Sequence, residues 1–383
     1  MHSSPIHFQC EQTTLTLHRY PPEQKTRSLQ AWDAADELLI QFIHTNKPQG
    51  PVLILNDQFG ALACALHSYA PISVSDSYIA QLATRHNLAE NGLAAIELRR
   101  SVDELPDASH IILKVPNNHG FLRHQLRQLK AWLPEGTQVV AAAKAKDIHA
   151  NLLQIFRDEI GPVEASLTIK KCRLITATCQ GTVNKHPSGH FPVEWSLDLA
   201  ALASPLRIVN HANVFSRDQL DIGARFLLEH LPQLQGDERV IDLGCGNGVL
   251  GVAMLQQANK AHIVFCDESF MALASAHDTV LRNMPTLIDH CEFVADDCLT
   301  QQADLSADWI VCNPPFHQQH AVTDHIAWQM LSDARRVLKI GGRMRIVFNR
   351  HLDYADKLSR LFGGCIHIAS NAKFVVLETI RRK

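Results

Sequence analysis

The chain runs twice through the same order of strand and helix signals, and this repetition constrains its fold more than any other feature. In each half, an apolar run of strand length leads through a turn into an apolar helical pattern, and further strand-like runs follow. These runs lie at 51–56, 72–76 and 111–115 in the first half and at 239–243, 262–267 and 309–313 in the second. Acids stand at places that match in order, Asp57 and Asp76 in the first half and Asp242 and Asp267 in the second. Because strands that alternate with helices indicate a parallel, doubly wound α/β sheet, we expect two tandem Rossmann-like α/β domains that arose by duplication.

The length of the chain agrees with two domains. Its 383 residues exceed the number that usually fold around one hydrophobic core, since domains hold about 100 to 200 residues each. A polar stretch rich in turn-forming residues, from Asn184 to Pro192, separates the two series of signals. We therefore place the boundary near residue 190, with one domain at 1–190 and the other at 191–383.

The composition excludes several classes of protein. No segment approaches the roughly 18 uncharged apolar residues of a membrane span, and the first residues, Met1 to Pro5, do not form a secretory signal, so we expect a cytoplasmic protein with no membrane partner. The ten cysteines include no C-x-x-C pair, and His317 and His320 lack a further ligand at a recognisable spacing, so no metal site is expected. A net charge of −3 does not by itself mark a nucleic-acid binder.

A glycine-rich loop follows the first strand-like run of the second half. Gly244, Gly246 and Gly248 stand between Asp242 and an apolar helical run. Glycines allow a tight turn and the close approach of a ligand to the N-terminus of the helix. A dinucleotide-binding loop would carry its third glycine where this chain has Val249, and an acid such as Asp242 would repel a pyrophosphate. The acid suits the cationic amino-acid end of S-adenosylmethionine, so the loop favours a methyl donor.

Acids at the ends of the next two strands complete the expected donor site. Asp267 ends the second strand, at the switch point of the sheet, where a carboxylate can accept both ribose hydroxyls. Glu268 is the alternative for this role. Asp296 and Asp297 end the presumed third strand, and one of them is expected to accept a hydrogen bond from the adenine amino group. Of these two, we favour Asp297.

The sequence Asn313-Pro314-Pro315-Phe316 ends the fourth strand of the second half, at the same edge of the sheet as the glycine loop. Two successive prolines fix φ and remove two amide donors, which leaves a turn lined by acceptors. The Asn313 side-chain oxygen and the Pro314 carbonyl can accept hydrogen bonds from an exocyclic NH₂ group, draw its lone pair out of conjugation and aim it at the sulfonium methyl. Phe316 can stack on a planar substrate, a contact worth about 1–3 kcal/mol per base. Asn313 is also expected to contact the donor.

The first half lacks both parts of this machinery. Its loop, 56–61, contains one glycine, and Val115-Pro116-Asn117-Asn118 replaces the catalytic turn. The bulky Phe59 is expected to occupy the space that a donor needs. The first domain is therefore expected to be a degenerate copy that serves folding, orientation or RNA contact.

These residues resemble a known family, the ribosomal RNA guanine-N2 methyltransferases of the RsmC and RlmG type. The likeness covers nearly the whole chain and is close over 210–225 and 311–320. It implies two class I methyltransferase domains, the N-terminal one degenerate, with S-adenosylmethionine as the cofactor. The positions that match the family's cofactor and catalytic residues are 242–248, Asp267, Asp297 and 313–316. Phe215, within the first stretch of close likeness, is expected to contact the substrate.

The N-terminal half looks most like the large-subunit branch of this family, in the segments 29–37, 53–57 and 143–149. The resemblance therefore implies that the substrate is a guanine of 23S ribosomal RNA. We expect the protein to be a monomer. The residues themselves indicate RNA binding less strongly than methyl transfer, because the basic residues are scattered in small clusters. The lysines expected to contact RNA are Lys144, Lys146, Lys170 and Lys171.

Two alternatives stay open. Asn-Pro-Pro followed by an aromatic residue serves any planar NH₂ group, so the acceptor could instead be a small-subunit ribosomal guanine, adenine N6 or a protein glutamine. The chain could also be a non-catalytic RNA-binding scaffold that has kept its fold. The intact glycine loop argues against the scaffold.

Overall fold

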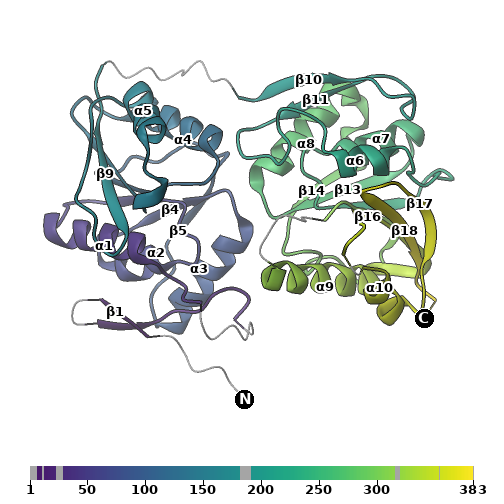
Figure 1. Ribbon diagram of the computed structural model, residues 1–383, viewed down its shortest axis with the longest axis horizontal. Helices are drawn as coiled ribbons and strands as arrows, with labels where there is room; N and C mark the ends of the chain where they lie inside the picture. The colour runs from purple at the N-terminus through teal and green to yellow at the C-terminus, as the bar shows by residue number, and fades with distance from the viewer. Residues whose placement is uncertain are drawn as a thin grey trace. The chain divides into compact units, whose positions relative to one another are not determined.

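The computed structural model describes residues 7–10, 13–22, 29–181, 191–314, 320–352 and 354–382. Its contacts divide the chain into two compact units, Met1–His190 and Phe191–Lys383, each of which forms its own sheet (Figure 1). Within the described residues, no helix is long and apolar enough to cross a membrane.

The N-terminal unit is built around a mixed sheet of seven strands. Its elements are β1 (His7–Cys10), β2 (Thr13–Thr16), α1 (Ala34–Asn46), β3 (Val52–Leu55), α2 (Ala61–Ala65), η1 (His67–Tyr69), β4 (Ile72–Ser75), α3 (Tyr78–Glu90), β5 (Glu97–Arg100), β6 (His110–Lys114), α4 (His119–Trp132), β7 (Gln138–Lys144), η2 (Ala145–Asp147), α5 (Ala150–Glu159), β8 (Val163–Ala165) and β9 (Cys172–Thr178). The strand order is β5-β4-β3-β6-β7-β9-β8, and β1 pairs with β2 in a separate hairpin. The strands from β5 to β7 are parallel, whereas β9 pairs antiparallel with β7 and β8.

The C-terminal unit repeats this plan. Its elements are β10 (Val193–Leu197), β11 (Leu206–Asn210), α6 (Ile222–Leu228), β12 (Arg239–Leu243), α7 (Val249–Gln257), β13 (His262–Asp267), α8 (Phe270–Asn283), η3 (Pro285–His290), β14 (Cys291–Ala295), β15 (Ala307–Cys312), α9 (His320–Val337), β16 (Leu338–Asn349), α10 (Tyr354–Phe362), β17 (Ile366–Ser370) and β18 (Phe374–Ile380). The strand order, β14-β13-β12-β15-β16-β18-β17, is that of the first sheet. The expected duplicated α/β fold is confirmed, with two antiparallel strands at one edge of each sheet that the sequence analysis did not anticipate.

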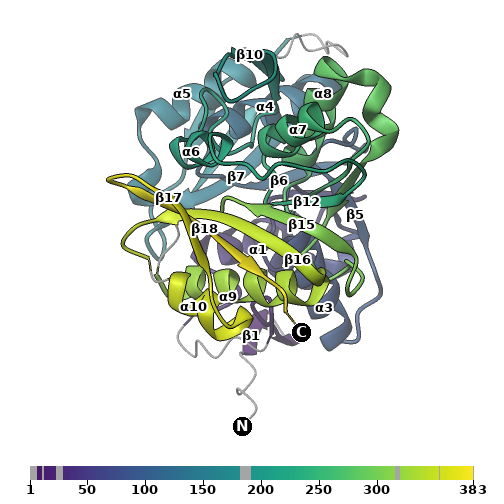
Figure 2. The same cartoon turned by 90° about the vertical axis from the view of Figure 1, so that its right-hand side faces the viewer.

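Helices cover both faces of the second sheet, and its central strands fill the space between them (Figure 2). Along β12, Val240 packs into a cluster with α6, α7 and α8, whereas Ile241 and Leu243 face a second cluster formed with α9 and α10. Strands that are buried on both faces need apolar residues at nearly every position. Asp242 interrupts this apolar run and is fully buried, so its carboxyl group requires a partner inside the protein.

The hydrogen-bond register aligns the two units residue by residue. Leu55 pairs with Val74 in the first sheet, as Leu243 pairs with Cys266 in the second. Counted from these pairs, the counterparts are Ser75 and Asp267, Asp76 and Glu268, and Asp57 and Cys245. The match of Asp57 with Asp242 and of Asp76 with Asp267, expected from their order alone, is therefore wrong. The order of elements does not determine register, which only the strand pairing sets.

The backbone of the first turn is the same in both units. Asn56 and Gly244 occupy equivalent positions with φ of 67° and 70°, and Gly60 and Gly248 have φ of 81° and 78°. Asparagine is one of the few residues that tolerates this left-handed conformation, so the degenerate copy keeps the turn after losing the glycine.

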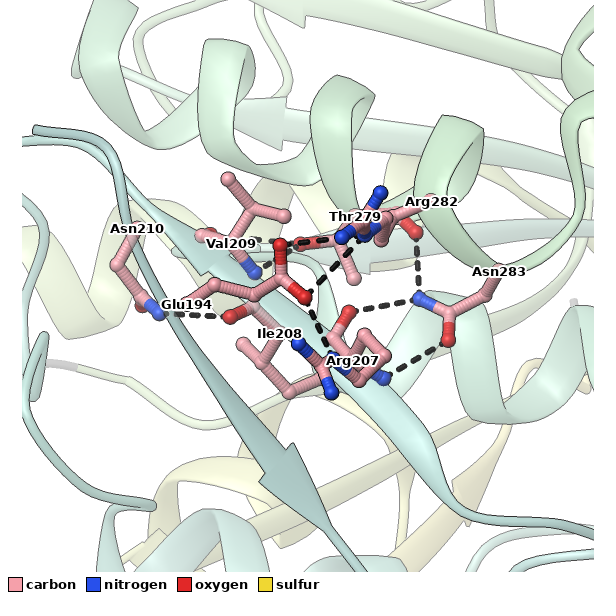
Figure 3. A network of polar contacts seen from close by, with 8 residues as sticks. All are labelled: Glu194, Arg207, Ile208, Val209, Asn210, Thr279, Arg282 and Asn283. Carbon is pink, nitrogen blue, oxygen red and sulfur yellow. Dashed lines mark hydrogen bonds and ion pairs between the residues drawn. The ribbon is translucent and has the colours of Figure 1, made fainter.

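Polar side chains on one helix hold the hairpin of the C-terminal unit (Figure 3). The amide of Asn283 donates to the carbonyl of Arg207 at 2.7 Å and accepts from its N–H at 2.8 Å. The hydroxyl of Thr279 accepts from the N–H of Val209 at 3.1 Å. Glu194 of β10 forms an ion pair with Arg207. This clamp fixes β10 and β11 to α8.

The N-terminal unit has the same clamp. Asn91 exchanges two hydrogen bonds with the backbone of Thr16, both of 2.8 Å. Asn87, which is completely buried, exchanges two of 2.8 Å with the backbone of His18 and donates a third, of 2.7 Å, to the carbonyl of Phe59. The segment that follows β2 is therefore held against α3 by side chains of one helix.

We predict that Asn87→Ala lowers the free energy of unfolding by about 2–4 kcal/mol, because a buried backbone group left without its partner costs about 1–3 kcal/mol. Urea denaturation of the full chain measures this change. The control is Asn46→Ala, which removes one exposed hydrogen bond to the carbonyl of Phe42 and should cost much less. Equal effects of the two substitutions would contradict the role given to Asn87.

Candidate active site

The glycine loop connects β12 to α7 at the carboxyl edge of the second sheet. All three glycines have left-handed φ, of 70° at Gly244, 54° at Gly246 and 78° at Gly248. A Cβ on Gly248 would lie 2.8 Å from that of Ala276 in α8, so this glycine lets the two helices pack. A Cβ on Gly246 would meet nothing within 4 Å among the described atoms. The loop is therefore tightly packed at Gly248, whereas the space beside Gly246 is open among the described atoms.

Asp242, in the strand before this loop, forms a buried hydrogen bond with the helix after it. One carboxylate oxygen accepts the N–H of Gly251 in α7 at 2.8 Å, and the other is buried with no partner in the described part of the chain. Burial raises the pKa of Asp242 to about 8. Asp242 is thus a buried carboxyl group with one oxygen that no described residue engages, and its contact with a methyl donor stays a prediction.

Asp267 ties the end of β13 to the same loop. Its carboxylate accepts the N–H of Gly246 at 2.9 Å and that of Ser269, the N-cap of α8, at 3.0 Å. In the first unit the equivalent residue is Ser75, whose hydroxyl accepts the N–H of Ser77 at 3.1 Å. The first unit therefore has the same local turn without the carboxylate.

The two acids after β14 differ in how their oxygens are engaged. Asp296 accepts from the Thr300 hydroxyl at 2.6 Å and from the N–H of Gln301 at 3.0 Å, so both of its oxygens serve the local turn. Asp297 is also buried, and burial raises its pKa although a hydrogen bond from the Gln329 side chain works against this. Both acids are engaged by neighbouring groups, and the choice of Asp297 for the adenine contact stays a prediction.

Asn313, directly after β15, is oriented by an acid from another element. Its amide nitrogen donates to Asp221 at 3.0 Å, and the same Asp221 oxygen caps α6 by accepting the N–H of Ala224 at 2.9 Å. Since carboxylates only accept, this bond points the nitrogen of Asn313 at Asp221 and the oxygen away from it. That oxygen is buried without a partner among the described residues, 3.0 Å from where a Cβ on Gly223 would lie.

The structure describes only the first of the three residues that follow Asn313 in the predicted catalytic turn. Pro314 is buried. Pro315 and Phe316 lie outside the described residues, so the stacking role expected of Phe316 stays a prediction.

A pocket of about 220 Å³ adjoins Asn313 through Asp221, which forms part of its wall. Phe215, expected to contact the substrate, is 61% exposed at this pocket. Asn349, at the end of β16, is 7% exposed, and its side-chain oxygen is buried with no partner within the described ranges. Ser216, Gln219 and Lys373 also line this pocket. No sequence signal singled out Asp221, Asn349 or Lys373 as site residues.

The equivalent position in the first unit is filled by an ammonium group. Lys114 ends β6 where Asn313 follows β15, and its nitrogen lies 2.8 Å from Asp36 and 3.2 Å from Asp33. Asp33 caps α1 as Asp221 caps α6. Phe59, expected to block the donor, packs into the hydrophobic core of the unit.

The four predicted lysines come together at one end of β7 and β9. Lys144 pairs with Cys172 across these strands, and the carbonyl of Lys171 accepts the N–H of Ala145 at 2.8 Å, one residue before Lys146. All four are exposed. Lys170 forms an ion pair with Glu37, which leaves the other three as the more available cations.

Each of the two units matches the model of a known protein family. Residues 5–181 match the family model described as RLMG N-terminal domain, and residues 205–378 match that of the methyltransferase small domain. The chain is 48% identical over 378 residues to a ribosomal RNA large subunit methyltransferase G of Pectobacterium atrosepticum, with 98% of each chain covered. It is 49% identical over 375 residues to the protein of that name from Aeromonas hydrophila, with 96% of this chain and 97% of the relative covered.

One solved structure has the same fold over the whole chain. It is the T. thermophilus 16S rRNA N2 G1207 methyltransferase (RsmC), in complex with AdoMet and guanosine. The TM-score is 0.77, and the alignment covers 100% of this chain and 99% of that one. At 19% identity, the likeness establishes the two-domain fold.

We predict that Asp242→Asn stabilises the protein increasingly as the pH rises from about 4 to 8. The carboxyl pKa of about 8 in the folded state exceeds the ordinary value, so the folded protein keeps a proton that the unfolded chain releases across this range, and wild-type stability falls with pH. Urea unfolding of both proteins at pH 5, 6.5 and 8 measures the difference. A stability difference that stays constant with pH would contradict the raised pKa.

Proposed function

The chain belongs to the ribosomal RNA large subunit methyltransferase G family, and on this premise we propose how its two units divide the reaction. The enzyme transfers a methyl group from S-adenosylmethionine to the exocyclic N2 of a guanine in 23S ribosomal RNA. The C-terminal unit performs the chemistry, and the N-terminal unit contacts the RNA.

The residues of the C-terminal unit fit the methyl donor. Gly244, Gly246 and Gly248 would hold its amino-acid end over the loop, where, among the described residues, nothing crowds Gly246 and one oxygen of Asp242 has no partner. Asp267 would accept hydrogen bonds from the ribose hydroxyls. Asp297 would contact adenine, and Asn313 would lie beside the reacting end. When bound, S-adenosylmethionine supplies an electrophilic methyl group on sulfur.

The observation that carries the proposal is the side-chain oxygen of Asn313, which has no partner in the described part of the chain and whose amide Asp221 orients. An exocyclic NH₂ group on a base is a weak nucleophile because its lone pair is delocalised into the ring. Hydrogen bonds from this NH₂ to the oxygen of Asn313 and to the carbonyl of Pro314 favour the geometry in which the lone pair is available. Positioning and acceptor placement of this kind supply the rate enhancement without an acid–base residue.

The pocket beside Asn313 supports guanine over the alternative acceptors. The Watson–Crick edge of guanine presents two neighbouring donors, N1–H and the N2 amine, whereas adenine has an acceptor at N1 beside its amine. The side-chain oxygens of Asn313 and Asn349 are each buried with no partner among the described residues, and we propose that they accept hydrogen bonds from these two donors. The exposed ring of Phe215 offers a face for stacking, which suits a planar base better than a glutamine side chain.

The N-terminal unit is suited to binding RNA and unsuited to catalysis. Lys114 puts a cation where the C-terminal unit has Asn313, and Ser75 replaces the ribose-binding carboxylate. Lys144, Lys146 and Lys171 form an exposed basic cluster for phosphate contacts. Because one chain contains both functions, a monomer suffices for the reaction. The proposed mechanism uses no catalytic metal, and we propose that the protein acts in the cytoplasm.

We predict that Asn313→Ala lowers single-turnover methylation of unmodified 23S ribosomal RNA by about 100-fold or more while leaving affinity for donor and RNA nearly unchanged, the pattern of lost transition-state stabilisation. Asp221→Leu should lower the rate in the same way, because it frees the Asn313 amide to turn. Asp221→Asn should restore much of the rate, since its oxygen can accept from Asn313. Near-normal turnover in Asn313→Ala would remove the proposed mechanism.

We also predict that replacing Lys144 and Lys171 together by alanine weakens RNA binding and reduces the slope of log affinity against log salt by about 2, because each lysine neutralises one phosphate. Calorimetric affinity for S-adenosylmethionine should not change. Lys260→Ala, which removes an exposed lysine of the other unit, is the control. An unchanged salt slope in the double variant would place the RNA-binding surface elsewhere.

A further inference from the structure

Three side chains of the N-terminal unit converge at a place that the methyl-transfer reaction does not use. They are His18, in the segment after β2, and His86 and Glu90, both on α3. Each offers one nitrogen or oxygen atom, and these atoms all lie within 4.8 Å of one another. Across the described ranges, no other group of three histidine, cysteine or acidic residues meets this condition.

The backbone that carries these side chains is held rigidly. The fully buried Asn87 binds both the N–H and the carbonyl of His18, at 2.8 Å each, and Asn91 does the same for Thr16. His86 and Glu90 are four residues apart on one helix, so they lie on the same face. Ligands placed by rigid elements lose little freedom when they bind an ion.

The three side chains have few other partners. The rings of His18 and His86 meet edge to face, with centroids 5.6 Å apart. Within the described part of the chain, neither imidazole forms a hydrogen bond and the Glu90 carboxylate has no cationic partner. Two neutral imidazoles and one carboxylate are a ligand set of zinc sites that leave a position open to water.

The second unit shows that the fold does not require this triad. Its clamp keeps polar side chains at the equivalent places, Thr279 and Asn283. The counterparts of His18, His86 and Glu90, counted from the equivalent helix caps Ser77 and Ser269 and from the clamped backbone, are Val209, Asp278 and Arg282. Because the clamp persists without the triad, the three ligands need an explanation other than folding.

We propose that His18, His86 and Glu90 bind one divalent transition-metal ion, of which Zn²⁺ has the matching chemistry, with water in the remaining position. Zinc ligand atoms lie about 2.0–2.2 Å from the ion, so small side-chain rotations must bring the three atoms closer. The ion fastens the segment after β2 to α3 and takes no part in methyl transfer. Sequence spacing did not point to it, because His18 and His86 are far apart in the chain.

The test is a titration of the full, chelator-treated chain with Zn²⁺, together with absorption spectroscopy after Co²⁺ substitution. The wild type should bind one ion tightly and give the visible bands of a low-coordinate Co²⁺ site. His86→Ala and His18→Val should each weaken this binding at least about tenfold, because even the loss of outer partners of a metal costs about 10- to 100-fold. His18→Val installs the residue that the second unit has at this place, so it should fold.

The matched control is His119→Ala. His119 and His149 form another pair of close imidazoles in the same unit, with centroids 5.9 Å apart, but belong to no group of three ligands. This variant should bind Zn²⁺ as the wild type does, and Zn²⁺ should raise the thermal midpoint of both. Equal Zn²⁺ affinity in the wild type and the two triad variants, or no tight site in the wild type, would overturn the proposal.

Discussion

The hydrogen bond from the amide of Asn313 to Asp221 links the end of β15 to the start of α6, and the proposed catalytic geometry depends on it. Asp221 accepts from Asn313 and also from the first turn of α6, so one carboxylate fixes both the helix and the amide. The orientation of the amide leaves its oxygen as a buried acceptor beside Gly223, where any side chain would fill the space. The proposed site for an NH₂ group needs an acceptor without an internal partner, and the oxygen of Asn313 has none among the described residues.

The two units show how such a site is lost while its scaffold persists. The N-terminal unit has an aspartate at the start of α1 where the other has Asp221, but it pairs with the ammonium of Lys114. The turn after β3 keeps its left-handed residue as Asn56. The carboxylate of Asp57 accepts the N–H of Ala63 at 2.9 Å, and that of Asp242 accepts the N–H of the equivalent Gly251. The two acids nevertheless stand at different positions relative to their strands. The packing constraints survived in the N-terminal unit, and the ligand-binding groups did not.

The parts of the site that the sequence predicted are those encoded by neighbouring residues. The glycine loop and Asn313 each follow a strand and Asp267 ends one, and the carboxyl ends of parallel strands meet at one edge of a sheet. Asp221 was missed because its partner lies 92 residues away, and Asn349 because nothing in the sequence marks the end of β16 as part of the pocket. The match of Asp57 with Asp242 failed because strand register depends on hydrogen bonds between distant segments. His18 and His86 meet for the same reason, through a clamp that only the fold displays.

The roles proposed for Asn313, Asp221 and the glycine loop all serve one reaction, methyl transfer to the N2 of a guanine by the C-terminal unit. The most direct test incubates the purified chain with labelled S-adenosylmethionine and unmodified 23S ribosomal RNA, digests the RNA and separates its nucleosides. We expect the label in N2-methylguanosine, and we expect none there when Asn313→Ala replaces the wild type. Label in N6-methyladenosine or in protein, or equal labelling by the variant, would contradict the proposed reaction.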